Sequence, residues 1–330
     1  MSTRMRLLML AALLLLCAAT SLMAGAHWLS PVDIWHAVWM PSATNVEDLL
    51  IRTTRISRTV LAITVGASLA VAGGILQTLT HNPLASPGIL GINAGALFVV
   101  VLIATFGGFG ISWSPYAGAF LGAAVAAAIV WWLAMHRATS ASPLRLILAG
   151  AALAALFSAF TQALLVIDQQ GLDAALFWLA GSVSGRPLDT AWPLVVIAAI
   201  GLLLSAPLLR DLNVLSAGDT VAASVGVRLR RLQALAIGAI VLLAGASVAL
   251  AGNIVFIGLI VPHIARRLLA ADLRVWLPGA ALLGAILTLG ADIAARLLIQ
   301  PGEIPIGVMT ALIGAPLFII LVRRQRNAHV

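Results

Sequence analysis

The chain has 330 residues, of which 62% are hydrophobic and only 9% are charged. Soluble domains usually carry about a quarter charged residues and a little under half apolar ones. So few charges could not cover the outside of a water-soluble fold, which indicates that the chain lies in lipid. Its apolar runs are continuous and lack the alternation of membrane β-strands, so we expect an all-α polytopic membrane protein.

The charged residues restrict the chemistry further. All 19 basic residues are arginine, and the formal net charge is +8. Without lysine the chain has no phosphate-binding lysine of a P-loop, so ATP would have to bind to another chain. The single Cys17 excludes an intrachain disulfide and a cysteine metal cluster. The six histidines show no ligand spacing, and we therefore expect no metal site. We expect no cofactor bound by this chain, and no nucleic-acid partner, because membrane topology accounts for the positive charge.

About ten apolar runs follow one another along the chain, and each is expected to be a transmembrane helix. Together they make residues 1–330 one transmembrane domain. The eighth run is short for a full crossing, and a further stretch at 174–180 is too short to cross and is expected at the surface. The ten runs lie at residues 7–26, 59–79, 89–106, 116–135, 144–167, 191–209, 232–251, 254–264, 277–298 and 306–322.

The first run has two interpretations. Arg4 and Arg6, the apolar run and the small residues Ala24-Gly25-Ala26 are also typical of a cleavable signal peptide. A signal peptide core is about 7–15 residues long, which is shorter than this run. We therefore favour a retained first helix, and a mature chain that starts at His27 is the alternative.

The arginines predict the orientation of the chain. With the N-terminus inside and ten crossings, 14 of the 19 arginines fall on the inner side. The five outer ones are Arg52, Arg55, Arg58, Arg186 and Arg296. Because cytoplasmic loops of membrane proteins carry an excess of arginine and lysine, this distribution predicts that both termini are cytoplasmic.

Two polar segments border the second run. At its outer end Arg55 and Arg58 run against the orientation bias, either as lipid-headgroup contacts or as a docking patch for an acidic partner. At its inner end a segment that begins with Gln77 has turn and helix-breaking signals at Asn82-Pro83 and at Pro87, which predict a sharp cytoplasmic turn.

A third polar segment covers residues 211–231 on the expected cytoplasmic side. Asp219 is expected to cap a short helix that Gly226 ends. Such a helix could enter a groove on a partner, and the alternative is an ordinary basic loop. The residues of interest are Gly218, Asp219, Ala222, Ala223 and Gly226.

A fourth set of polar and helix-breaking residues lies in the last third of the chain. Pro262-His263 belongs to a short helix before a basic turn, and Asp292 lies near the end of a long helix with Arg296. An outer loop rich in proline and glycine follows, with Glu303, Pro305 and Gly307.

These four segments, in this order, resemble the FecCD family, the permease subunits of bacterial importers for iron–siderophore complexes, haem and vitamin B12. The resemblance covers Arg55 to Pro316. Two stretches, Trp178–Arg186 and Gly307–Pro316, are most similar to the ferric dicitrate subunits. One departure is Ser57, which stands where the family usually has proline and leaves a less rigid backbone between two retained arginines.

The resemblance implies a type II ABC importer permease in the bacterial inner membrane, with an inverted repeat of helices two to five and seven to ten. Two such subunits, identical or closely related, would form the channel for a ferric siderophore or ferric citrate-type chelate. Two ATPase chains would hold ATP and magnesium and bind the segment Gly218–Gly226, so this chain would not be an enzyme. A periplasmic binding protein would place its glutamates on Arg55, Arg58 and Arg296.

The resemblance also implies a structural or translocation role for a further set of residues. These are Gln77, Asn82, Pro83, Pro87, Pro262, His263, Glu303, Pro305 and Gly307.

The alternatives to a ferric chelate importer are import of haem or vitamin B12 and two other classes of function. An ion-coupled secondary transporter keeps ionisable groups deep in the membrane, where a charge costs about 3 kcal/mol or more. Here nearly all of the 11 acids fall in loops, and only Asp292 is ambiguous. A metal-dependent intramembrane enzyme would need clustered histidines and acids, and these are scattered.

Overall fold

The computed structural model describes residues 2–25, 28–40, 45–107, 114–135, 143–167, 170–299 and 302–327. These residues form helices and connecting turns, and none of them forms a strand. The all-α fold class predicted from the sequence is confirmed. Ala26, the last residue of the first predicted run, lies outside the described residues.

The helices occupy every predicted run. The first half of the chain contains α1 (Thr3–Met23), α2 (Pro31–Trp39), α3 (Val46–Leu50), a π-helical turn (Ile51–Arg55), α4 (Ile56–Leu79), a 3₁₀ turn (Pro87–Leu90), α5 (Ile92–Phe106), α6 (Pro115–Met135) and α7 (Pro143–Ile167). The second half contains α8 (Gln170–Ala180), α9 (Leu188–Ser205), a 3₁₀ turn (Ala206–Leu208), α10 (Leu209–Leu215), α11 (Asp219–Ser224), α12 (Leu229–Ile240), a π-helical turn (Val241–Gly245), α13 (Ala246–Ala251), α14 (Ile257–Leu268), α15 (Leu273–Leu298) and α16 (Ile306–Asn327).

Seven helical stretches within the described residues are long and apolar enough to cross a membrane, and α5 and α16 are shorter apolar helices. The second of these stretches begins at Val46 and not at residue 59, because α3 and the π-helical turn run directly into α4. The ten crossings themselves stay a prediction.

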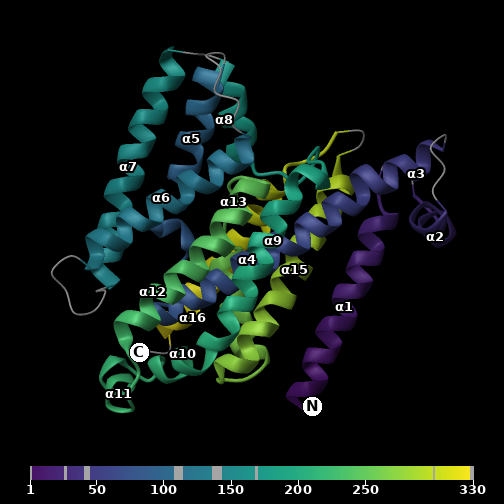
Figure 1. Cartoon of the computed structure of the whole chain (residues 1–330). Helices are drawn as coiled ribbons and strands as arrows, with labels where there is room; N and C mark the ends of the chain where they lie inside the picture. Colours follow the sequence, from purple (N-terminus) through teal and green to yellow (C-terminus); the bar gives the residue numbers. More distant parts are fainter. Residues whose placement is uncertain are drawn as a thin grey trace.

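Helix α4 forms the centre of the bundle, with α15 and α14 against it and α9, α12 and α13 around it (Figure 1). Its side chains are buried along almost the whole helix. Close approach depends on glycine, because a Cβ at Gly66 would overlap the carbonyl of Gly284, and one at Gly73 would overlap the carbonyl of Gly258. Small residues at helix crossings are what packing in lipid requires, since lipid supplies no hydrophobic drive between helices.

Helices α5, α6, α7 and α8 form a second group beside this centre (Figure 1). Helices α5 and α6 cross at Gly95 and Gly122, where each glycine faces the backbone of the other helix. Helix α8, which was expected at the surface, is partly buried, since Trp178 is packed inside while Phe177 is exposed.

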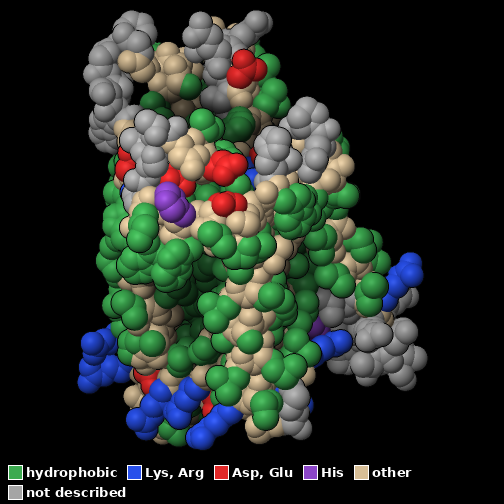
Figure 2. All heavy atoms as spheres, turned by 90° about the vertical axis from the view of Figure 1, so that its right-hand side faces the viewer, with side chains coloured by type: hydrophobic (Ala, Val, Ile, Leu, Met, Phe, Trp, Pro, Cys, Tyr) green, Lys and Arg blue, Asp and Glu red, His purple; other side chains and the backbone are tan. Residues whose placement is uncertain are grey.

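The two ends of the bundle carry different charges. Helix α1 begins, and α16 ends, at the end where α11 lies (Figure 1). Figure 2 shows basic side chains gathered along this lower end and acidic side chains mainly in the upper half. We call the end with α11 the inner end and the opposite one the outer end, following the orientation predicted from the arginines.

Candidate functional site

Two arginines that are far apart in sequence meet at the outer end. Arg58 donates from Nη2 to Oδ1 of Asp292 at 2.8 Å, and Arg296 pairs with Oδ2 of the same carboxylate at 2.7 Å. The two oxygens of Asp292 thus each pair with a different guanidinium group, and Asp292 itself is completely buried. Arg58 also pairs through Nη1 with Glu303 at 2.7 Å. We call Arg58, Asp292, Arg296 and Glu303 the outer ion cluster.

The outer ion cluster is tied to the first helix. Arg296 donates from Nη1 to the carbonyls of Ser21 (3.0 Å) and Ala24 (2.9 Å), and from Nη2 to the hydroxyl of Ser21 (2.8 Å). The guanidinium of Arg55 lies against Gly25, where any Cβ would overlap it. The end of α1 therefore packs against these arginines.

This geometry corrects one expectation. The sequence predicted that Arg55, Arg58 and Arg296 lie together at the outer end, and they do. They were also expected to be an exposed patch, yet their exposed fractions are only 5%, 4% and 4%. The physical reason is that Asp292 and the end of α1 bind them inside the bundle. Arg52, one turn before Arg55, is the exposed arginine of this segment.

Glu303 is the member of the outer ion cluster that faces water, with 43% of its side chain exposed. Ser184 donates its hydroxyl to Glu303 Oε2 at 3.1 Å and accepts a hydrogen bond from Arg58 at 3.2 Å. Burial by itself would raise the pKa of Glu303, but the hydrogen bond and charge of Arg58, helped by the Ser184 hydroxyl, lower it overall. The carboxylate form is thus favoured here.

The loop that carries Glu303 is held by the backbone. The carbonyl of Pro305 accepts hydrogen bonds from the amides of Val308 and Met309 as α16 begins. Gly307 donates to the carbonyl of Gly181 at 3.0 Å, and a Cβ at Gly307 would overlap the carbonyl of Ala180. Glycine at this position lets α16 approach the end of α8.

At the inner end, the sharp turn after α4 contacts the segment that carries α11. His81 Nε2 lies 3.1 Å from Oδ1 of Asp219, and His81 has a positive φ of 49°. The Oδ1 atom of Asn82 accepts a hydrogen bond from the amide of Leu84 at 2.9 Å, an Asx turn. Pro83 lies at the same turn, and Pro87 begins the 3₁₀ turn that leads to α5.

The short helix α11 differs from its prediction at one end. Gly218 occupies the N-cap position with a φ of 115°, and Asp219 is the first helical residue. The prediction that Asp219 caps the helix is wrong, because its carboxylate faces His81. At the other end Gly226 has a φ of +87°, as a helix-ending glycine does, and its amide donates to the carbonyl of Ala223 at 3.0 Å.

The side chains of α11 divide into a buried and an exposed set. Ala222 is fully buried, whereas Ala223 is exposed, as are the neighbouring apolar residues Val221 (45%) and Val225 (64%). The inner end therefore presents a small apolar protrusion among arginines.

Gln77 connects α4 with α14 near the inner end. Its amide nitrogen donates to the carbonyls of Gly258 and Leu259, and its amide oxygen accepts from Arg266 at 2.8 Å. The guanidinium of Arg266 lies over the ring of Trp276 at 4.4 Å. Pro262 lies inside α14 and is buried, and His263 follows it with Nε2 buried and unpartnered among the described residues.

Some functional neighbours were not singled out as site residues. The sequence leaves Asp292 an ambiguous acid and gives Ser21, Ser184 and Arg266 no role. The available signal for Asp292 is an acid four residues before Arg296, on the same face of a helix. Among the described residues no group of three His, Cys, Asp or Glu side chains could hold a metal ion.

Comparison with known proteins places this geometry in a family. The profile of the FecCD transport family matches residues 13–324. A siderophore transport system permease of Bacillus subtilis, YfiZ, is 44% identical over 94% of this chain and 93% of its own length. The ferric enterobactin permease FepD of Escherichia coli is 40% identical over 95% and 93%. The ferric dicitrate permease FecC of the same organism is 40% identical over 90% of both chains.

A solved structure shows the same fold. An inward-facing ABC transporter of the metal-chelate type superposes with a TM-score of 0.83 at 33% identity, and covers 98% of this chain and 99% of the other. The agreement extends along nearly all of the chain, from α1 to α16.

Proposed function

Because the chain belongs to the FecCD transport family of ABC importer permeases, we propose that it forms half of the channel through which a ferric siderophore or ferric citrate-type chelate enters the cell. The supporting observation is that relatives named for siderophore, ferric enterobactin and ferric citrate transport are 39–44% identical along more than nine tenths of this chain. Two such subunits, identical or paralogous, surround the channel in this proposal.

The test is uptake in proteoliposomes that contain this chain, its ATPase and its binding protein. ATP-dependent accumulation of radiolabelled iron is expected from ferric citrate or a ferric siderophore, and none when a non-hydrolysable ATP analogue replaces ATP. Vitamin B12 is the second substrate to include, because two vitamin B12 import permeases are 37% and 38% identical to this chain. Uptake of vitamin B12 or haem without uptake of any ferric chelate would contradict the proposal.

We propose that two ATPase chains, which hold ATP and magnesium, bind at the inner end. The support is the exposed apolar surface formed by Val221 and Ala223 of α11 and by Val225 directly after it, with arginines nearby in the sequence. A groove on a partner that buries these side chains would remove an apolar surface from water. Residues 211–231 would then act as the coupling segment.

We further propose that a periplasmic binding protein docks on the outer end. In this structure Arg55, Arg58 and Arg296 are buried, so an approaching carboxylate would first meet exposed Arg52 and the half-exposed Glu303. We expect Arg52→Glu to weaken docking in nanodiscs and to reduce its salt dependence, since exposed charges are screened within about 8–10 Å. Arg210→Glu, an exposed arginine at the inner end, is the matched control.

A further inference from the structure

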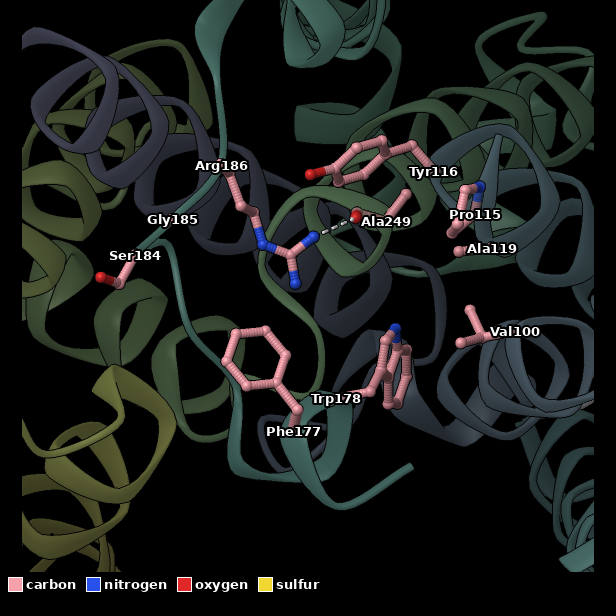
Figure 3. A pocket seen from close by; sticks show the side chains of 10 residues that line it. All are labelled: Val100, Pro115, Tyr116, Ala119, Phe177, Trp178, Ser184, Gly185, Arg186 and Ala249. Atoms are coloured by element: carbon pink, nitrogen blue, oxygen red, sulfur yellow. Dashed lines mark hydrogen bonds between the residues drawn. The ribbon is translucent and has the colours of Figure 1, made fainter. Parts of the chain in front are cut away.

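A second polar site lies at the outer end, beside the outer ion cluster. It is a cavity of about 430 Å³, within the range of roughly 300–1,000 Å³ that small-molecule sites usually have. Its walls come from the start of α6, the end of α8, the loop before α9 and the end of α13. The ring of Tyr116, the ring of Phe177, the indole of Trp178 and the guanidinium of Arg186 surround it (Figure 3).

Arg186 is anchored in this cavity without an acidic partner. Its Nε donates to the carbonyl of Ser182 at 3.0 Å, and its Nη1 donates to the carbonyl of Ala249 at 3.2 Å. The guanidinium carbon lies 5.4 Å from the ring centre of Tyr116 and 6.0 Å from that of Phe177. Since the described residues that line the cavity include no carboxylate, the positive charge is not neutralised within it.

Trp178 supplies a second donor. Its side chain is 95% buried, with an exposed fraction of 5%, and its Nε1 has no hydrogen-bond partner among the described residues. Buried tryptophan nitrogens usually have a partner, because an unpaired buried donor costs about 1–3 kcal/mol. In Figure 3 the indole nitrogen lies at the end of the ring system that is nearer to Arg186.

The two donors and the aromatic walls define the chemistry that fits. Arginine and tryptophan side chains can only donate hydrogen bonds, so the partner must supply acceptor oxygens, and the charge of Arg186 favours an anion. The other lining side chains, which include Val100 and the indole of Trp178, favour an apolar or aromatic body next to those oxygens. Exposed Phe177 and Gly185 at the rim leave the cavity open to the outside.

We propose that this cavity binds an organic anion, whose carboxylate oxygens meet Arg186 and Trp178 and whose apolar body lies against the aromatic walls. The proposal deepens the proposed function and rests on it, because the organic ligand of an iron chelate carries such groups. A phosphate of an outer-leaflet lipid presents the same anionic oxygens, and the aromatic walls favour the chelate ligand. Ser184 lines the cavity and also binds Glu303, so an occupant would contact the outer ion cluster through one residue.

The experiment measures binding of 2,3-dihydroxybenzoate, an aromatic carboxylate, to the full chain in phosphatidylcholine nanodiscs, by saturation-transfer difference NMR. The neutral 2,3-dihydroxybenzamide is the matched probe. We expect wild type to bind the acid saturably. Arg186→Gln should raise the dissociation constant about tenfold, because it removes a hydrogen bond to a charged group, and Trp178→Phe should raise it less. The amide should bind wild type and Arg186→Gln equally.

Control variants separate this site from general effects. Arg274→Gln and Trp192→Phe change an exposed arginine and an exposed tryptophan elsewhere and should bind the acid as wild type does. Arg186→Lys keeps the charge and should retain part of the affinity. This variant tests the site even where Arg186→Gln unfolds the loop. No saturable binding to wild type, or equal binding of the acid by wild type and a folded Arg186→Gln, would overturn the proposal.

Two further measurements identify the source of the anion. If phosphatidylglycerol in the nanodisc displaces the acid and Arg186→Gln loses a tightly held lipid in native mass spectrometry, the occupant is a lipid headgroup and the chelate assignment is overturned. Binding that depends on Arg186 without uptake of any ferric chelate would leave the site standing and contradict the proposed function. Uptake of a ferric chelate without binding that depends on Arg186 would support the proposed function and contradict the proposed site.

Discussion

The buried acid Asp292 determines how the outer arginines lie. Taking charges out of water is costly, and the attraction between them offsets this only when the geometry is good and the remaining polar atoms are bonded. Asp292 supplies this attraction by pairing with Arg58 and Arg296 through different oxygens. The sequence placed the arginines on one side of the membrane, but it could not predict their burial, because the acidic partners of Arg58 are more than 200 residues away.

The first prediction concerns this residue. Asp292→Asn keeps the shape of the side chain but leaves two buried guanidinium groups without their shared anion, and should cost about 3–5 kcal/mol of unfolding free energy. Thermal unfolding of the purified protein in detergent measures this. Glu303→Gln is the matched control, since that side chain is 43% exposed and screening by water reduces its pair to about 0–1 kcal/mol. Equal losses for both variants would contradict the assigned importance of burial.

The cavity at Trp178 and Arg186 shows another limit of sequence analysis at this scale. Both residues belong to a stretch that was identified only by its likeness to the ferric dicitrate subunits. Their shared cavity depends on Tyr116 and Ala249, which come from other helices. A sequence motif identifies residues that occur together, and only the fold shows which side chains face the same space.

At the scale of helices, long apolar runs were predicted well because their period and length depend on local sequence alone. The start of the second helical stretch was missed for a physical reason. The run from Arg52 to Arg58 was expected just outside the second helix because it is polar, yet it is helical, and Asp292 and Glu303 neutralise Arg58 from distant parts of the chain. Helix α2 was missed as well, although Ser30 and Asp33 form a capping box at its start.

The second prediction concerns the crossing of α4 and α14. Gly73→Val places a branched side chain where even a Cβ would overlap the carbonyl of Gly258, so the two helices must separate. Overpacking of this kind costs about 1–3 kcal/mol or more, and the melting temperature should fall accordingly. Gly238→Ala in α12 is the control, because no atom lies within 4 Å of its Cβ and alanine favours a helix by about 0.8–1 kcal/mol. A stable Gly73→Val protein would show that the crossing can adapt.

At the scale of the whole molecule, α1 is connected to the bundle at both of its ends. Arg6 donates to the carbonyl of Leu268 at the inner end, and Ser21 hydrogen-bonds Thr59 at 2.9 Å and Arg296 at 2.8 Å near the outer end. A signal peptide that is removed would leave Arg296 without three of its hydrogen-bond acceptors. These contacts favour the retained first helix over the alternative of a cleaved one.

The third prediction follows from these contacts. We expect the mature protein to keep α1, so that mass spectrometry of the purified protein finds peptides from residues before His27 in stoichiometric amount. Ser21→Ala should lower the melting temperature, since it removes the hydrogen bonds of the Ser21 hydroxyl to Thr59 and Arg296, and the bond to the charged arginine is worth about 1.5–3 kcal/mol. Leu15→Ala, an exposed position of α1, is the control. A mature chain that starts at His27 would favour the signal-peptide interpretation.

The last prediction concerns the two ends of the molecule, because an importer must transmit ATP binding from one end to the other. We infer that α11 is the inner contact, and Gly226 closes it with a φ of +87° that a β-branched residue adopts poorly. Gly226→Val should distort the helix end at a cost of about 1–2 kcal/mol, while Gly226→Asn, which tolerates this backbone, should not.

Ala223→Arg should block burial of the exposed face, and Ala223→Ser should leave it intact. Uptake should fall about tenfold or more in the first variant of each pair, as expected for a change of 1.4 kcal/mol or more in coupling, while the protein stays in the membrane with its outer ion cluster unchanged. The measurements are ATPase co-purification and ATP-dependent uptake in proteoliposomes, and normal values for both Gly226→Val and Ala223→Arg would exclude α11 as the coupling element.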